Sequence, residues 1–188
     1  MHTVEDIRFG LSLELSHNNI KTSGHQLRNG KQYVELCNVC FLADESYIID
    51  APEYEDLVSG EWYEKNYVPR IDDQLTKVVD ILNADNDSRH GIIAFYNIND
   101  INDPNMICTM YVSVRLRPVG KSHAIDYTVH MRSSDVREYR SDLKFHRSVY
   151  KKLANMLKER HGVSIIEGDI IWYADSLQCW DKDFNKLL

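Results

Sequence analysis

The run CTMYVSVRL, residues 108–116, alternates apolar and polar side chains and is rich in β-branched and aromatic residues. Such a pattern is typical of a half-buried β-strand. GIIAFY (91–96) precedes it and AIDYTVHM (124–131) follows it, and Asn, Asp, Pro or Gly residues bound all three runs. Three apolar runs separated by turn signals predict neighbouring strands of a sheet.

Further runs extend this sheet outward. QYVELCNVCFL (32–42) and VSIIEGDIIWYA (163–174) also predict strands. Two helices are expected, at 72–82 and 142–160, because apolar residues recur there at spacings of three and four. The first apolar stripe is Leu75, Val78, Val79 and Leu82; the second is Phe145, Val149, Leu153 and Met156, with Gly162 placed to end the helix. Strands outnumber helices, so we expect an α+β fold: a single domain over residues 1–188, with a large mixed β-sheet packed with helices.

Composition narrows the class of function. The formal net charge of -7 opposes nucleic-acid binding, which depends on clustered Lys and Arg. The start MHTVEDIRF lacks the apolar stretch of a signal peptide, and no run approaches the ~18 apolar residues of a membrane span, so a cytoplasmic protein without membrane contact is expected. Cys37 and Cys40 lack a second cysteine pair and the eight histidines show no ligand spacing, so no metal site is expected.

Five segments occur in an order that carries further information: DQL (73–75), NDSRHGIIAFYN (86–97), MICTMYV (106–112), HMRSSDV (130–136) and EGDIIWYADSLQCWD (167–181). Together they resemble the thymidylate synthase and pyrimidine nucleotide hydroxymethylase family, and the Arg-Ser-x-Asp box at 132–135 is the most specific of them. The resemblance implies a thymidylate synthase-like fold, a pyrimidine nucleotide substrate and 5,10-methylenetetrahydrofolate as cofactor. It also implies a homodimer in which Arg89 acts in the partner's site.

The resemblance assigns roles to residues of this chain. Cys108 takes the place of the nucleophile and Glu53 that of the catalytic carboxylate. Phosphate contacts are expected from Arg132 and Ser133, and from Arg89 and Arg28. Asp135 is expected to contact the pterin of the folate. A guanidinium beside a thiol lowers the thiol pKa and enlarges the nucleophilic thiolate fraction, which is the chemistry expected of Arg132 beside Cys108.

Several positions depart from the family pattern. His90 replaces a second arginine, and Ile107 and Thr109 replace the proline and histidine that flank the nucleophile. Gln178 and Trp180 stand where a His-x-Tyr pair holds the sugar hydroxyl, so we expect them at the sugar. The chain ends seven residues beyond Asp181, whereas the family continues and closes over the folate; this favours hydration over hydride transfer.

In the family, a residue of the helix after the Arg-Ser-x-Asp box binds the pyrimidine base. Uracil-specific members place an asparagine there, and none occurs here before Asn155. Asp142 is the nearest candidate, and a carboxyl group suits the amino group of cytosine. If the gap relative to the family pattern lies elsewhere after the box, His146 takes that position instead. Asp142 can also serve as the N-cap of its helix.

Three hypotheses follow. The first is folate-dependent hydroxymethylation of a cytidine nucleoside monophosphate through a covalent Cys108 adduct. The second is a compact thymidylate synthase acting on dUMP. The third is a nucleotide-binding protein that has lost catalysis, which the departures at His90, Thr109, Gln178 and Trp180 suggest.

Overall fold

A single long strand, β7 (Ser164–Trp180), organises the structure. The computed structural model describes residues 1–24, 29–44, 48, 60–103, 106–160, 162 and 164–187. In them, seven strands form one sheet in the order β1-β2-β7-β5-β4-β3, with β6 also paired to β7. The other strands are β1 (Lys21–Thr22), β2 (Gln32–Leu42), β3 (Ile92–Ala94), β4 (Thr109–Val119), β5 (Ser122–Met131) and β6 (Ser134–Asp135). β7 runs parallel to β5 and β6 and antiparallel to β2, so the sheet is mixed, as the sequence predicts.

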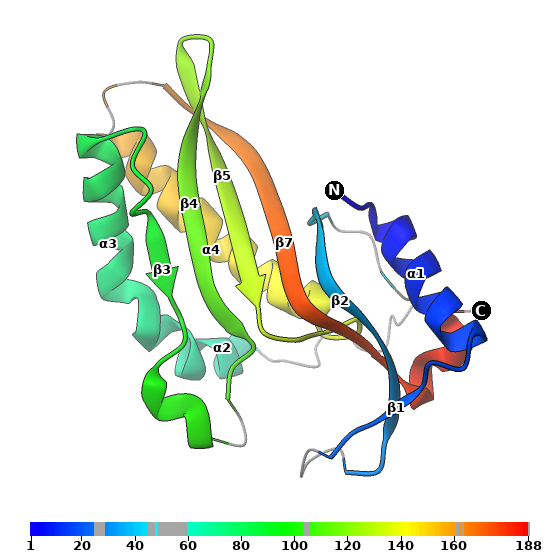
Figure 1. The fold of residues 1–188 in the computed structure, drawn as a ribbon. Coiled ribbons are helices and arrows are strands. Elements are labelled where there is room, and N and C mark those ends of the chain that lie inside the picture. The colour runs from blue at the N-terminus through cyan, green and yellow to red at the C-terminus, as the bar shows by residue number, and fades with distance from the viewer. Residues whose placement is uncertain are drawn as a thin grey trace.

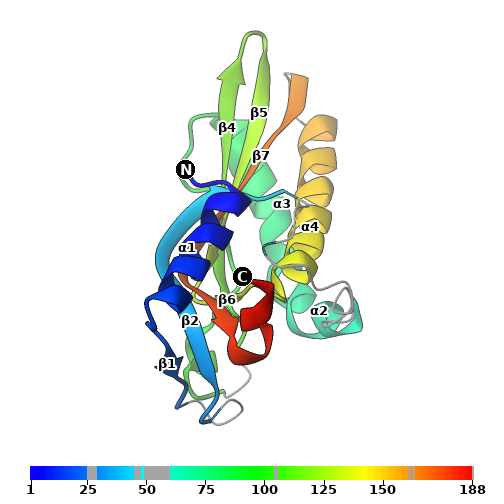
Figure 2. The ribbon, with the colours of Figure 1, turned by 90° about the vertical axis from the view of Figure 1, so that its right-hand side faces the viewer.

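Helices pack against this sheet in two places. The α-helices of the described residues are α1 (Val4–Ser16), α2 (Gly60–Asn66), α3 (Val68–Ala84) and α4 (Tyr139–Arg160), and their 3-10 helices are η3 (Ile98–Asn102) and η4 (Asp181–Lys186). α3 and α4 lie together on one side of β4, β5 and β7, whereas α1 packs along β2 near the other edge (Figures 1 and 2). In the described part of the chain, no helix combines the length and the apolar character that crossing a membrane requires.

The core lies between the sheet and the α3–α4 layer. The predicted stripe of α3 is buried in full, with Leu75, Val78, Val79 and Leu82 all at most 2% exposed. α4 contributes Phe145, Val149 and Leu153 to the same core, facing Trp172 and Tyr127 of the central strands. The amphipathic periodicity that predicts the two helices is therefore the pattern of residues that they bury.

Most predicted elements are confirmed with shifted ends. The strand at 32–42 has the predicted bounds, and the predicted helix at 72–82 extends over Val68–Ala84. α4 begins at Tyr139, three residues earlier than expected. Asp142 therefore lies inside the first turn, and the interpretation of Asp142 as the N-cap is wrong.

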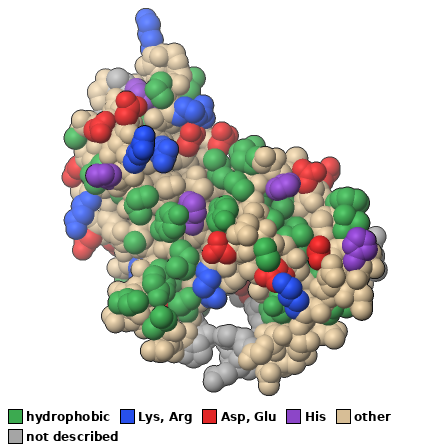
Figure 3. Space-filling view, viewed as in Figure 1, with side chains coloured by type: hydrophobic (Ala, Val, Ile, Leu, Met, Phe, Trp, Pro, Cys, Tyr) green, Lys and Arg blue, Asp and Glu red, His purple; other side chains and the backbone are tan. Residues whose placement is uncertain are grey.

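No helix of the described residues covers the opposite face of the central strands (Figure 1). A row of rings crosses it: Tyr111 of β4 stacks on His130 of β5 with centroids 4.1 Å apart, and Tyr173 of β7 lies 5.5 Å beyond His130. Hydrophobic and histidine side chains are interspersed over this surface in Figure 3. We call the surface that contains Tyr111, His130 and Tyr173 the open sheet face.

Candidate active site

Cys108 lies immediately before β4, where polar groups from the end of β5 approach its side chain. Its sulfur is 3.4 Å from Oγ of Ser133 and 3.9 Å from Nη2 of Arg132. The backbone also joins the two segments, since the Arg132 N–H donates to the Cys108 carbonyl at 2.8 Å. In the sequence, Arg132 and Ser133 lie 24 and 25 positions after Cys108. The structure thus brings the three residues together.

A β-bulge sets the direction of this segment. The β4–β5 register shifts between Thr109 and Tyr111, so one extra residue is accommodated in β4. A bulge reverses which face the following side chains occupy. As a result, Thr109 is buried beneath α4 while Tyr111 lies on the open sheet face. Cys108 is left half-buried at the start of the strand.

Opposing influences set the acidity of the Cys108 thiol. Burial raises its pKa above the ordinary value, and the nearby carboxylates of Asp142 and Glu138 raise it further. The Ser133 hydroxyl and the Arg132 guanidinium act in the other direction, because both stabilise a thiolate. The net pKa is raised, so the free protein holds Cys108 mainly as a thiol at neutral pH.

Asp142 is buried in the first turn of α4, and its carboxyl group meets one hydroxyl. Tyr63 of α2 donates its phenolic hydrogen to Oδ1 of Asp142 at 2.6 Å. Burial raises the pKa of Asp142 to about 7, the Tyr63 hydrogen bond lowers it, and Glu138 and Asp135 raise it. Asp142 therefore exchanges a proton close to neutral pH, which suits a group that must offer either a donor or an acceptor.

His146 faces inward one turn further along α4. It is fully buried, with Nε2 lying 3.1 Å from Oγ1 of Thr109 and Nδ1 lying 3.2 Å from the hydroxyl of Tyr127. Burial lowers its pKa to about 3, so the imidazole is neutral. Both ring nitrogens have partners in the core. The His146 ring is thus held by contacts within the core.

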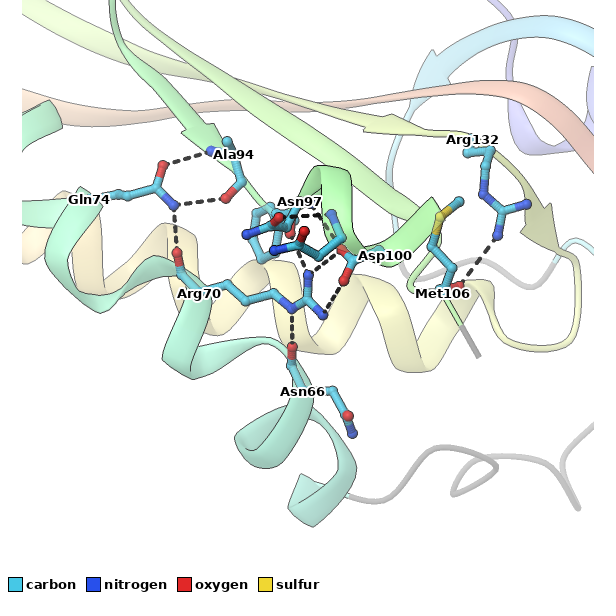
Figure 4. A network of polar contacts seen from close by, with 10 residues as sticks. Asn66, Arg70, Gln74, Ala94, Asn97, Asp100, Met106 and Arg132 are labelled. Atoms are coloured by element: carbon cyan, nitrogen blue, oxygen red, sulfur yellow. Dashed lines mark hydrogen bonds and ion pairs between the residues drawn. The ribbon is translucent and has the colours of Figure 1, made fainter. Parts of the chain in front are cut away.

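A second polar network holds β3 and η3, which come before Cys108 in the chain (Figure 4). Arg70 of α3 donates to the carbonyls of Asn66 and Phe95 and pairs with Asp100 of η3 at 2.5 Å. Gln74 forms two hydrogen bonds with the backbone of Ala94, to its carbonyl at 2.7 Å and from its N–H at 2.8 Å. The glutamine of the DQL segment thus clamps the edge strand β3, and Arg70 holds the 3-10 helix that precedes Cys108.

Asp135, Gln178 and Trp180 lie where β6 and β7 meet. Asp135 pairs with Gln178 in the sheet, and Oδ1 of Asp135 accepts from the Arg137 N–H at 3.0 Å. Gln178 is half-buried, and its side-chain Nε2 donates to Oγ of Ser176 at 2.8 Å. Trp180 is buried against the ring of Tyr33, with centroids 4.9 Å apart. The backbone holds this corner together as well, since the N–H of the residue after Asp135 donates to the Gln178 carbonyl at 3.0 Å.

The remaining predicted residues lie apart from this group or outside the described residues. Arg89 is exposed in the connection between α3 and β3, near the Gly91 carbonyl that accepts from the Val114 N–H. Cys108 lies six positions before Val114, so the start of β3 that follows Arg89 is roughly 20 Å along β4 from Cys108, at about 3.3 Å per strand residue. Arg28 and Glu53 fall outside the described residues.

Comparison with known proteins decides the family. Residues 24–187 match the model of the thymidylate synthase family. The chain belongs to that family. No protein in a search of curated sequences matches it. The family carries out folate-dependent one-carbon transfer to a pyrimidine nucleotide and uses methylenetetrahydrofolate, and the mixed sheet with its helices has the family's α+β architecture.

In this thymidylate synthase family member, the folate contact expected of Asp135 stays a prediction. Asp135 is buried, and its Oδ1 accepts a hydrogen bond from the Arg137 N–H. A carboxylate accepts hydrogen bonds from N–H groups, which is the chemistry that a pterin ring requires. When bound, the folate supplies a one-carbon unit to the pyrimidine.

Sequence reasoning did not find Tyr63, Arg70 or Asp100. Tyr63 lies 79 positions before Asp142, and no local pattern links the two. Arg70 had a usable signal, because it occupies the same helix as Gln74, one turn earlier, and side chains four apart share a helix face. Asp100 had one as well, since Asn97 and Asp100 form the capping box of η3.

Proposed function

We propose that this protein transfers a hydroxymethyl group to carbon 5 of a cytidine nucleoside monophosphate through a covalent adduct of Cys108. The observation that carries the proposal is the contact of the Cys108 sulfur with both Arg132 and Ser133. A guanidinium and a hydroxyl stabilise a thiolate at the moment of attack. Asp142 is near enough to influence the same thiol.

The covalent step balances with the residues present. Cys108 first loses its thiol proton to water; its thiolate then forms a bond to carbon 6, and the electron pair of the 5,6 double bond moves through carbon 4 onto N3. Neutral Asp142 gives its proton to N3, which leaves a carboxylate stabilised by Tyr63. Carbon 5 is then an enamine carbon and attacks the one-carbon unit. Loss of the carbon 5 proton, for which we propose Glu53 as the base, would release the one-carbon unit from the folate nitrogen as an exocyclic methylene on the pyrimidine. Water adds to that methylene to give the hydroxymethyl group, the sulfur leaves carbon 6 as the 5,6 double bond re-forms, and the N3 proton returns to Asp142.

The phosphate is assigned to cationic and hydroxyl groups at the edge of the site. Arg132 is exposed and offers its guanidinium fork, and Ser133 offers a hydroxyl on the same turn. We include Arg28 in this set, and Gln178 and Trp180 at the sugar. Gln178 supports that assignment because its half-buried amide lies on the strand that pairs with Asp135.

Arg89 completes the phosphate site from a second subunit. Its place at the far end of β3 from Cys108 on its own chain favours a role in the partner's site, which a homodimer allows. The open sheet face, with Tyr111, His130 and Tyr173, offers an apolar and aromatic surface for such a dimer.

The cytosine assignment rests on Asp142. A neutral carboxyl group offers one O–H donor and one carbonyl acceptor, which matches N3 and the amino group of cytosine. A mismatched base leaves buried polar groups unsatisfied at about 1–3 kcal/mol each. We therefore expect cytidine nucleotides to be preferred over uridine nucleotides.

Product analysis tests the proposed function. Protein is incubated with methylenetetrahydrofolate and either CMP, dCMP or dUMP, and the nucleotide products are weighed by mass spectrometry. We expect a hydroxymethyl group on a cytidine nucleotide. A methyl group on dUMP with formation of dihydrofolate instead assigns the protein as a thymidylate synthase.

A nucleotide-binding protein without catalysis is the second candidate, and the raised pKa of Cys108 favours it. A thiol that stays protonated is a weak nucleophile. Calorimetry separates the two possibilities: tight binding of a pyrimidine nucleotide with neither folate binding nor product formation supports the binding protein and contradicts the enzyme.

A further inference from the structure

The hydrogen bond between Tyr63 and Asp142 is held rigidly by its surroundings. The Tyr63 ring is 5% exposed and stacks on Phe145, with centroids 4.7 Å apart and planes 6° apart. Tyr67 packs edge-on against Tyr63 at 5.2 Å. Because Phe145 and Asp142 lie on the same helix, the stacking aims the phenol of Tyr63 at a fixed oxygen of Asp142, namely Oδ1.

This geometry determines where a proton sits on neutral Asp142. Oδ1 accepts the Tyr63 hydrogen and therefore needs a free lone pair in that direction. A carboxylic acid has one carbonyl-like oxygen and one hydroxyl oxygen, and the better acceptor is the carbonyl oxygen. The acid proton is thus placed on Oδ2. Asp142 then presents an acceptor and a donor in a fixed order.

The order of donor and acceptor matters because cytosine and uracil present a donor and an acceptor in opposite order on the same edge of the ring. Cytosine shows an N–H donor at position 4 and an acceptor at N3, whereas uracil shows an acceptor at position 4 and a donor at N3. A carboxylic acid whose proton moves freely between its oxygens complements both bases. One whose proton is confined to a single oxygen complements one of them and leaves the other with opposed groups.

We propose that Tyr63 is a specificity-determining residue, which selects cytosine over uracil by confining the Asp142 proton to Oδ2. This inference rests on the proposed function, since it takes Asp142 as the group that meets the base. Tyr63 itself acts through Asp142 and is a positioning residue.

The groups around Asp142 keep the neutral form accessible. Glu138, at the turn before α4, and Asp135, on β6, are like charges that oppose ionisation of Asp142. Cys108, just before β4, and Tyr67, just before α3, are the other titratable groups that respond to Asp142. Arg132 faces Cys108. Loss of the Tyr63 hydroxyl removes the one hydrogen bond among described residues that favours the carboxylate.

Competitive calorimetry on the full chain tests the selection, with dCMP and dUMP as the probes. We expect the wild type to prefer dCMP, and Tyr63→Phe to lower the ratio of the two affinities about tenfold, because one opposed polar pair is relieved. Tyr150→Phe is the matched control. Its hydroxyl also lies in the α4 layer and accepts from the Gly168 N–H at 2.9 Å, away from Asp142. An unchanged ratio in folded Tyr63→Phe overturns the proposal.

A titration of the free protein keeps the test independent of the proposed substrate. Carbon-13 NMR of labelled aspartate follows Asp142 in the wild type and in Tyr63→Phe. We expect the pKa of Asp142 to rise in the variant, because the lost hydrogen bond stabilised the carboxylate. An unmoved titration overturns the proposal. If the titration moves but the wild type prefers dUMP, or binds neither nucleotide, the proposed function fails while confinement of the proton stands.

Discussion

The sulfur of Cys108 and the hydroxyl oxygen of Ser133 lie 3.4 Å apart, on two segments that the sheet brings together. This contact and the Arg132 guanidinium are the described groups nearest the sulfur that favour its thiolate. They work against burial, which favours the thiol. The reactivity of Cys108 therefore depends on a balance that single substitutions can shift.

Arg132→Ala is expected to raise the pKa of Cys108, because it removes the positive charge 3.9 Å from the sulfur. Alkylation of Cys108 by iodoacetamide at neutral pH should slow several-fold, as followed by mass spectrometry of the Cys108 peptide. Arg132→Lys should retain part of the rate. Arg115→Ala on β4 is the exposed control and should leave it unchanged. Equal alkylation rates in all variants would contradict the role of Arg132.

Asp142→Asn should change how stability depends on pH. The pKa of Asp142 is raised to about 7 in the folded chain and is about 3.9 unfolded, so the folded state binds the proton more tightly. The stabilisation from Asp142 is complete below pH 4 and is lost as pH rises towards 7. Relative to wild type, the variant should gain a few kcal/mol of unfolding free energy over that window. Urea denaturation at several pH values measures it.

Titration of His146 also changes the stability with pH, so the effect of Asp142 has to be measured as a difference between Asp142→Asn and wild type. Burial lowers its pKa to about 3, so its contribution to stability is lost as pH falls from about 6.5, the ordinary value, towards 3. That slope opposes the slope of Asp142, and the wild-type curve shows only their sum. A difference between Asp142→Asn and wild type that is flat from pH 4 to 7 would contradict the raised pKa of Asp142.

Arg70→Ala should destabilise the fold by about 2 kcal/mol, since it removes hydrogen bonds to two carbonyls and the partly buried pair with Asp100. Arg160→Ala breaks only an exposed pair with Asp80 and should cost less than about 0.5 kcal/mol. Urea denaturation of both variants gives the comparison. Similar losses in the two would show that the network of Figure 4 does not fix the segment before Cys108.

Arg89 acting across a dimer predicts complementation between two inactive variants. Cys108→Ser and Arg89→Ala, unfolded and refolded together in equal amounts, should recover about a quarter of wild-type activity, because half of the random dimers carry one intact site. Each variant refolded alone is the control. Absence of recovery in mixtures that form dimers would place Arg89 outside the site.

Local patterns were sufficient for much of the fold. The stripe of α3 and the alternation in β2 and β4 arise from neighbouring residues, so periodicity finds them. α1 was missed because Gly10 interrupts its interior and Phe9 is exposed, which blurs the apolar stripe. Its capping box, Thr3 with Asp6, was the available signal.

The candidate site was less accessible to sequence reasoning. Cys108, Arg132 and Ser133 were found because family motifs carry them, although their contact is long-range. The Tyr63 hydroxyl reaches Asp142 through the packing of α2 on α4, which no sequence spacing records. The burial of the Asp142 side chain likewise depends on where α4 begins, and helix ends are the least certain feature of a sequence pattern.

Release of tritium from carbon 5 of a cytidine nucleoside monophosphate tests the central role of Cys108. With methylenetetrahydrofolate, the wild type should release tritium to water, and Cys108→Ser should release none above background, because carbon 5 becomes nucleophilic only after sulfur adds to carbon 6. Equal release by wild type and Cys108→Ser would contradict the covalent mechanism.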